Sequence, residues 1–218
     1  MGAHAEIYMQ YGCGFCAPQD WLNFDASPTL RFERIPLLGR LYARNGRRFP
    51  ENVRYGDIVR GLPVSLESCR GIYCSHVLEH LTYHELRAAL RNTYSYLSPG
   101  GTFRMVLPDL ETLTRSYLAD PSEHAAYRLM EAMDLGRKHK PRSLAGLAAE
   151  WLGHSAHQWM WDEKSLTYEL RDAGFVTIRR AQFNDCADTR FLAVEEQGRF
   201  EGCLALECSS TGGRRARS

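Results

Sequence analysis

The feature that most constrains this sequence is a series of short β-prone runs that stop abruptly at a glycine, a proline or a polar residue. Such runs occupy residues 6–11, 21–25, 52–57, 71–75 and 102–107. The residues at which they stop are Gly12, Asp25, Asp57, Ser75 and Pro108. Aromatic and β-branched runs bounded by turn-forming residues are typical of strands. The chain is therefore expected to be built around a sheet.

Two helical patterns separate later runs. The first spans 82–97, begins with a capping box of Thr82 and Glu85, and precedes the helix breaker Pro99-Gly100-Gly101. The second spans about 163–173 and stops at Gly174. Strands that alternate with helices predict an α/β fold, in which a mostly parallel sheet carries helices on its faces.

The rest of the chain completes this organisation. Residues 175–178 and 203–207 have the composition of two last strands, while 110–162 is helical in composition and falls outside the alternation. We expect a helical insertion over the sheet at 110–162. One domain is expected over 1–210 and a disordered tail over 211–218.

Composition excludes several classes of protein. With 44% hydrophobic and 24% charged residues, the chain is neither disordered nor fibrous. A net charge of +1 predicts no strong attraction to polyanions. Residues 31–60 nevertheless hold eight arginines, which form either a solvated loop or a phosphate-facing patch, and we favour the loop. No apolar run approaches the roughly 20 residues of a membrane helix, and no secretion signal opens the sequence. We therefore expect a cytoplasmic protein without membrane contact.

Seven cysteines without framework spacing predict reduced thiols. Cys13 and Cys16 form a C-x-x-C pair, which in other settings serves redox chemistry or zinc binding. A redox pair needs a helix N-terminus, and a zinc site needs a second ligand pair with recognised spacing. We therefore favour a ligand-binding loop here.

The polar residues that follow the strands are the candidates for binding. Ligands of open α/β sheets bind beyond the carboxyl ends of the strands. There Gly12 and Gly14 allow close backbone approach, and Asp25 is suited to ribose hydroxyls. Each residue alone is more often a turn glycine or a surface acid, but in this order they favour a nucleoside-type ligand. Asp25 lies only eleven positions after Gly14, against about 20 in dinucleotide-binding folds, which argues against NAD or FAD.

Several segments together resemble the class I S-adenosylmethionine-dependent methyltransferases. They are Tyr11-Gly12-Cys13-Gly14, residues 20–25, 55–58 and 97–103, and Ser75-His76-Val77-Leu78-Glu79-His80-Leu81. The resemblance implies a Rossmann-like sheet of seven strands with an antiparallel last strand, and S-adenosyl-L-methionine as cofactor. It also implies contacts of the methionine end near Tyr11, Gly12, Cys13 and Gly14, ribose at Asp25, adenine at Asp57 and Ile58, and a cofactor wall at Ser75 and His76. The sequence departs from the family in lacking a long first crossover helix, so residues 16–18 are expected to supply contacts there.

A methyltransferase needs a base only if its acceptor loses a proton during attack. His76 is the first candidate because it follows the strand expected to face the methyl group, and His157 is the second. His154 and Asp109 come next. A wall or packing role for these histidines is the alternative. The stretch 154–162, with two histidines and two tryptophans, either lines an acceptor pocket or packs the insertion onto the sheet.

Some related methyltransferases bind a divalent ion through E-x-x-E-H after the fourth strand. This chain has His76, Glu79 and His80 at those positions, which, with His154 or His157, would suit zinc better than magnesium. We favour structural capping by Glu79 and His80, and so expect no metal.

The function expected from this reading is transfer of a methyl group to oxygen or nitrogen of a small-molecule or sugar-type acceptor. No N/D-P-P-Y/F signature follows the fourth strand, which weakens DNA and protein-amide acceptors. The alternatives are an RNA or other nucleic-acid methyltransferase that uses the arginines of 31–60, and a catalytically silent domain that binds the cofactor to regulate a partner. Oligomeric state is left open.

Overall fold

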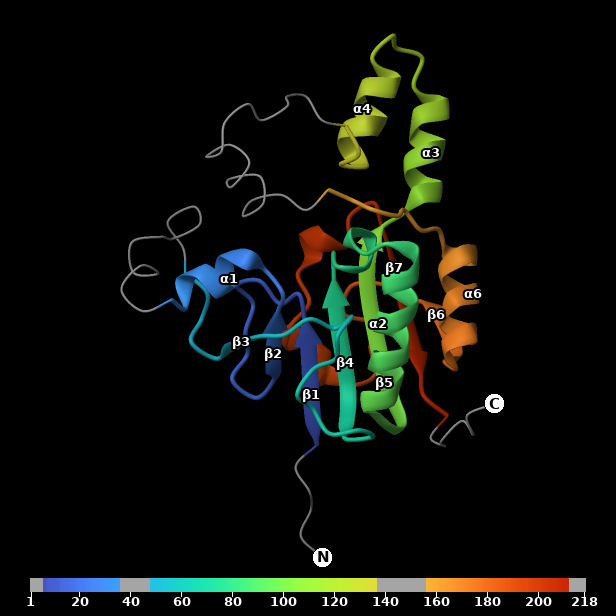
Figure 1. Cartoon of the computed structure of the whole chain (residues 1–218). Helices are drawn as coiled ribbons and strands as arrows, with labels where there is room; N and C mark the ends of the chain where they lie inside the picture. The colour runs from blue at the N-terminus through green and yellow to red at the C-terminus, as the bar shows by residue number, and fades with distance from the viewer. Residues whose placement is uncertain (1–5, 36–47, 137–155, 212–218) are drawn as a thin grey trace, which may run out of the picture.

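The computed structural model describes residues 6–35, 48–136 and 156–211 (Figure 1). Its strands are β1 (Ile7–Tyr11), β2 (Leu22–Asp25), β3 (Val53–Tyr55), β4 (Cys69–Ser75), β5 (Leu97–Pro108), β6 (Val176–Arg180) and β7 (Cys203–Ser209). The α-helices are α1 (Pro28–Glu33), α2 (Tyr83–Tyr96), α3 (Leu110–Ala119), α4 (Ala125–Ala132) and α6 (Glu163–Ala173). Short 3₁₀ turns are η2 (Leu78–His80), η3 (Thr189–Ala193) and η4 (Gln197–Arg199).

The seven strands form one sheet in the order β3-β2-β1-β4-β5-β7-β6. The pairs β2–β3, β1–β2, β1–β4 and β4–β5 are parallel, whereas β7 runs antiparallel to both β5 and β6. This confirms the predicted mixed sheet with an antiparallel last strand. The first crossover, from Gly12 to Trp21, contains no helix, as the short spacing predicted.

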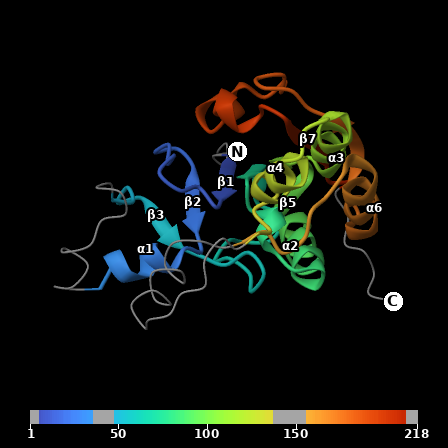
Figure 2. The same cartoon turned by 90° about the horizontal axis from the view of Figure 1, so that it is seen from above.

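Successive side chains of each strand point to opposite faces of the sheet. One face is packed by Met9, Ile72 and Met105 together with leucines of α2 and α6. The opposite face is packed by Tyr8, Tyr73 and Val106. Here the segment 181–202, which carries η3 and η4, supplies the cover, so this part of the sheet is covered by 3₁₀ turns where helices were expected. Figure 2 shows this segment and α2 on opposite sides of the sheet.

The two predicted helices form as their end signals indicate. Thr82 N donates to Glu85 Oε2 at 2.9 Å, which completes the capping box of α2. Gly174 ends α6 with a left-handed φ of 108°, a conformation that favours glycine. Strand β5 begins at Leu97 instead of Thr102, because a register shift between Cys69 and Gly71 accommodates residues 98–101 in the ladder.

The region expected to be an insertion carries α3 and α4, which lie beyond the carboxyl ends of the central strands (Figure 1). Residues 137–155, which include His154, lie outside the described ranges, and so does the tail at 212–218. The chain then returns across the sheet edge, where Leu110 N donates to Trp161 O at 2.9 Å. None of the helices in the described ranges combines the length and apolar composition needed to span a bilayer.

Candidate functional site

A cavity of about 320 Å³ opens where β1 and β4 end. Three parts of the chain line it: the strand residues Gln10, Tyr73 and Ser75, the first-crossover residues Gly12, Cys13, Gly14, Phe15 and Cys16, and Val194, Glu196 and Arg199 from the segment before β7. The structure thus brings together the glycines and Ser75 at one site. We call it the donor cavity.

The glycine loop has the geometry of a ligand cradle. Gly12 and Gly14 have φ of +67° and +54°, and a Cβ on Gly12 would lie 2.1 Å from Val77 Cγ2. A Cβ on Gly14 would meet no protein atom within 4 Å, so its absence leaves room in the cavity. The loop can therefore bring backbone groups against a ligand without side-chain interference.

Asp25 holds this loop. Gly14 N donates to Asp25 Oδ2 at 2.9 Å, and Ser27 N donates to Oδ1 at 2.7 Å. The two bonds hold the carboxylate at the end of β2, and the resemblance assigns the ribose hydroxyls to this same residue. The glycine cradle beside a buried acid at the end of β2 fits a nucleoside cofactor.

Five predicted cofactor residues do not themselves line the donor cavity: Asp25 and His76, which bond to lining residues, and Tyr11, Asp57 and Ile58. Tyr11 is buried in the core, where its hydroxyl accepts from Thr93 Oγ1 at 3.2 Å. Asp57 Oδ1 accepts from Val59 N at 2.9 Å, which fixes the turn after β3. The side chain of Ile58 is buried in the main core. Tyr11 and Ile58 thus support the site by packing.

His76 links the donor cavity to a second cluster. It adopts a φ of +54°, its Nε2 donates to Arg199 O at 3.1 Å, and its Nδ1 lies 3.3 Å from Glu79 Oε1. Burial by itself lowers the pKa of His76, but contacts with Cys203, Glu79 and Arg199 O outweigh burial and raise it to about 10. A histidine that keeps its proton at neutral pH is placed to hold these groups together.

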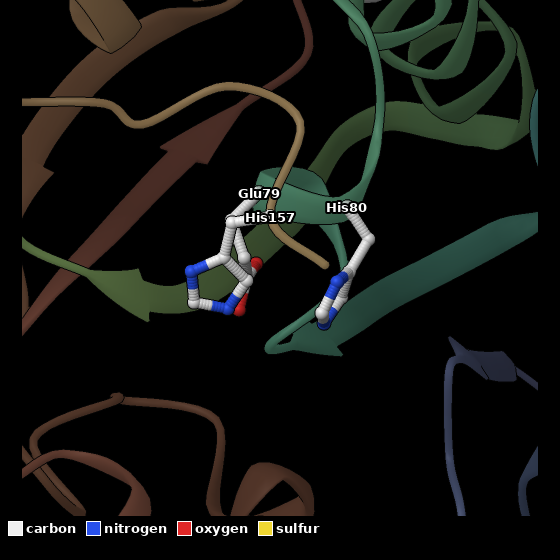
Figure 3. Close-up of side chains that lie close together, drawn as sticks. All are labelled: Glu79, His80 and His157. Carbon is white, nitrogen blue, oxygen red and sulfur yellow. The ribbon is translucent and has the colours of Figure 1, made fainter. Parts of the chain in front are cut away.

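Glu79, His80 and His157 form the second cluster (Figure 3), with ligand atoms within 4.8 Å of one another. Glu79 is fully buried; its Oε1 pairs with His76 Nδ1 at 3.3 Å, and its Oε2 has no hydrogen-bond partner among the described residues. His157 Nδ1 is likewise buried without a partner. Burial lowers the pKa of His157 and outweighs the opposing effect of the Glu79 carboxylate, while nearby His80 adds to the lowering. His157 is thus favoured in its neutral form.

Backbone bonds bring this cluster together from distant parts of the chain. Gln158 N and Trp159 N donate to Glu79 O at 2.7 and 3.2 Å, which anchors the segment after His157 on η2. One carboxylate with two imidazoles is a donor set that suits zinc and other transition metals. These three residues could therefore hold a metal ion, a use that the sequence raised for His76, Glu79 and His80 together with His154 or His157.

The remaining candidates serve packing or capping. Asp109 accepts from Glu111 N and Thr112 Oγ1 and pairs with Arg180, so it caps α3. Trp161 is buried and stacks on Tyr83, whereas Trp159 is half exposed. The aromatic stretch is therefore divided between core and surface.

Burial raises the pKa of the Cys13 and Cys16 thiols, and each is raised further by a nearby acid, Asp25 and Glu196 respectively. This is opposite to the low pKa that a redox-active pair requires. The two cysteines line the donor cavity as wall residues.

Sequence reasoning missed Val194, Glu196 and Arg199. Arg199 Nε donates to Ser75 Oγ at 2.9 Å across 124 positions of sequence. No local periodicity or motif marks such a contact. The only sequence signal was the polar run at 195–201, which resembles an ordinary solvated loop.

A family profile described as a methyltransferase domain matches residues 10–179. A SAM dependent methyltransferase from Archaeoglobus fulgidus is similar in structure at 16% identity, with a TM-score of 0.51 over 94% of this chain and 86% of that one. A SAM-dependent methyltransferase from Thermotoga maritima, described as a possible histamine N-methyltransferase, gives 15% identity, a TM-score of 0.52, and coverage of 95% and 84%. No curated protein sequence matches.

The profile covers most of the chain, and the fold, the glycine cradle and the acid after β2 agree with it. The cofactor is accordingly S-adenosyl-L-methionine. The chain belongs to the methyltransferase domain family and is an S-adenosylmethionine-dependent methyltransferase.

Proposed function

We propose that this enzyme methylates oxygen or nitrogen of a small-molecule or sugar-type acceptor. The observation that carries the proposal is the position of the Glu79–His80–His157 cluster. Ser75 lines the donor cavity, His76 follows it directly, and His76 Nδ1 lies 3.3 Å from Glu79. A polar, partly buried cluster beside the donor site is suited to handling an acceptor that must lose a proton.

The bound cofactor supplies a sulfonium that is already a good methyl donor. The protein must then hold the acceptor in line at near-attack distance, which supplies much of the acceleration. His157 takes the acceptor proton, because its imidazole is favoured in the neutral form and its Nδ1 has no hydrogen-bond partner among the described residues. The buried Glu79 carboxylate stabilises the positive charge that then develops on the ring.

A second candidate use of the same side chains is metal binding. Glu79 Oε2 and His157 Nδ1 favour it, since both atoms are buried without a hydrogen-bond partner among the described residues. A metal held by Glu79, His80 and His157 would polarise the acceptor and lower the pKa of its hydroxyl. Removal of metal ions by a chelator would abolish activity if the cluster holds a metal, and would leave it unchanged if His157 acts as a base alone.

A nucleic-acid acceptor receives less support from the described arginines of 31–60. Arg31 lies over the Tyr55 ring, Arg34 donates to Pro50 O, and Arg60 pairs with Asp57. These three side chains make internal contacts. Retention of RNA that weakens steeply with salt would favour this alternative.

The test follows transfer of a labelled methyl group from the cofactor to fractionated metabolite and RNA pools. We expect labelling of a small polar acceptor by the wild type, loss of at least about 100-fold in His157→Ala, and no change in His124→Gln, an exposed histidine directly before α4. Activity that survives exhaustive chelation assigns the proton to His157, whereas activity lost on chelation and restored by zinc assigns the cluster to a metal. Cofactor binding without labelling of any pool would instead support a regulatory domain.

A further inference from the structure

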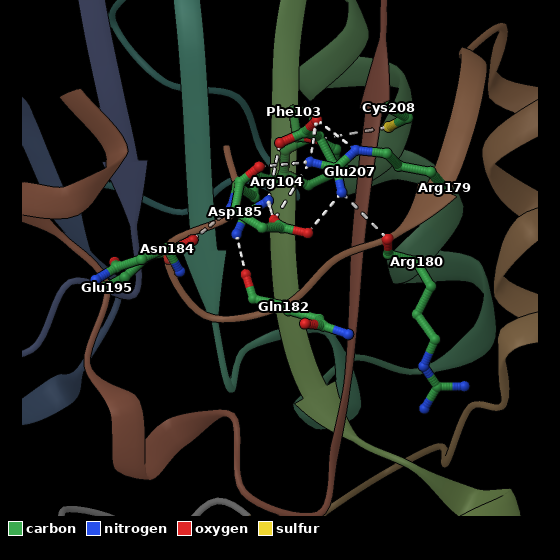
Figure 4. Close-up of polar contacts among 10 residues, drawn as sticks. All are labelled: Phe103, Arg104, Arg179, Arg180, Gln182, Asn184, Asp185, Glu195, Glu207 and Cys208. Atoms are coloured by element: carbon green, nitrogen blue, oxygen red, sulfur yellow. Dashed lines mark hydrogen bonds and ion pairs between the residues drawn. The ribbon is translucent and has the colours of Figure 1, made fainter. Parts of the chain in front are cut away.

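The segment 181–202, here called the β6–β7 arm, is fixed to the centre of the sheet by buried charge. Arg104 in β5 is fully buried and pairs with Glu195 and Asp185 of the arm (Figure 4). It also donates to Gln182 O at 2.6 Å, and Asn184 N donates to the second oxygen of Glu195 at 2.7 Å. The position of the arm is therefore well determined.

This anchor places two opposite charges at the donor cavity. Glu196 follows the anchored Glu195 directly, and Arg199 lies at the end of η4; both line the cavity. Arg199 Nε and Nη2 donate to Ser75 Oγ and Ser75 O at 2.9 and 3.1 Å. Since Ser75 is neutral, these bonds orient the guanidinium without neutralising it.

Neither charge has a counter-charge in the part of the chain that the structure describes. Across the described ranges, Arg199 has no carboxylate and Glu196 no cationic group within 4.0 Å, and they do not pair with each other. A half-buried guanidinium keeps three further N–H donors, and its usual partner is a carboxylate bound through two parallel bonds. A cation and an anion held apart in one cavity are suited to a zwitterion.

The cofactor supplies such a group, because its amino-acid end carries an α-carboxylate and an α-ammonium. The first crossover offers no helix N-terminus to bind the carboxylate. Cys16 Sγ lies 3.7 Å from Ala193 O, so this crossover contacts the arm instead.

We propose that Arg199 binds the carboxylate and Glu196 the ammonium of the amino-acid end of S-adenosylmethionine. The arm thereby replaces the contacts that a first crossover helix would make. The proposal rests on the assignment of this cavity to the cofactor.

The test compares two ligands by calorimetry: S-adenosylhomocysteine, and 5′-methylthioadenosine, which lacks the amino-acid end. We expect the wild type to prefer S-adenosylhomocysteine. Arg199→Ala should weaken that ligand about 10- to 100-fold, the range for a charge-assisted bond, and leave 5′-methylthioadenosine within about twofold. Arg199→Lys should lose less, and Glu196→Gln should also weaken only S-adenosylhomocysteine.

Two variants in the same arm serve as matched controls. Arg190→Ala removes one positive charge and Glu201→Gln one negative charge, both from residues that do not line the cavity. Each variant should leave the affinities for S-adenosylhomocysteine and 5′-methylthioadenosine unchanged. Thermal melts of every variant establish that each is folded.

The two ligands distinguish a wrong cofactor assignment of the cavity from a wrong role for Arg199. Binding of neither ligand by the wild type would overturn the cofactor assignment of the cavity. Equal wild-type affinity for both ligands, or equal weakening of both in Arg199→Ala, would overturn only the role of Arg199. An unchanged S-adenosylhomocysteine affinity in Arg199→Ala would also overturn the role of Arg199 in cofactor binding. The arginine would then be a candidate for binding the acceptor.

Discussion

The backbone N–H of Gly14 donates to the carboxylate of Asp25 at 2.9 Å, which ties the first crossover to the end of β2. The bond joins the two sequence features that first indicated a nucleoside ligand. It also makes Asp25 responsible for the shape of the cradle, in addition to the ribose contact implied by family resemblance.

Asp25→Ala is expected to weaken S-adenosylhomocysteine about 10- to 100-fold, because both the loop contact and the acceptors for ribose are lost. Asp25→Asn should also lose affinity, since one carboxylate oxygen becomes a donor that opposes a backbone N–H. Calorimetry measures both. Asp20→Asn, an exposed acid of the same crossover, is the control, and an unaffected Asp25→Ala would remove Asp25 from the site.

Gly12→Ala should lower the free energy of unfolding by about 2–4 kcal/mol, because a left-handed φ and an overpacked contact with Val77 both oppose the new methyl group. The double variant Gly12→Ala/Val77→Ala should recover part of this loss by relieving the contact. Gly14→Ala, with open space around its Cβ, should cost about 1–2 kcal/mol in stability but weaken cofactor binding. Urea unfolding and calorimetry separate the two effects; equal stability of Gly12→Ala and Gly14→Ala would contradict the packing argument.

Arg104→Met should cost about 3–5 kcal/mol, because it leaves the buried Glu195 carboxylate without its cation. The double variant Arg104→Met/Glu195→Gln should recover part of that cost, since no buried charge then remains unpaired. Guanidinium unfolding of the two variants measures the difference. If the double variant is less stable than Arg104→Met, the charge argument fails.

The stability of the arm should depend on pH through Asp185. Hydrogen bonds from Arg179 and Arg104 outweigh burial and lower the pKa of Asp185 from 3.8 to about 2. Between these values the unfolded chain binds more protons than the folded one, so unfolding free energy should fall as pH decreases from about 4 to about 2. Asp185→Asn should remove this part of the acid dependence. The check is unfolding free energy against pH for wild type and variant, and superimposable slopes would contradict the assignment.

Local patterns in the sequence identified most of the framework. The capping box of Thr82 and Glu85 and the stop at Gly174 act within a few residues, so each predicts a helix end without knowledge of the fold. The same holds for Gly12, Gly14 and Asp25, because parallel strands place their carboxyl ends at one edge of the sheet. The expectation of helices on both faces of the sheet was wrong for the face that Tyr8, Tyr73 and Val106 pack, because segment 181–202 covers it. Which segment covers a face depends on how a long connection packs, and local sequence patterns do not show this.

What the sequence determined is thus the alternation of strands and helices, the cradle and the acid beside it. Only the tertiary structure decided that Arg104 pairs with Glu195, that Arg199 reaches Ser75, and that His157 meets Glu79. It also buried Ile58 in the core and away from the donor cavity. Periodicity and capping are local properties of a chain, whereas these contacts join residues whose proximity depends on the path of every crossover between them.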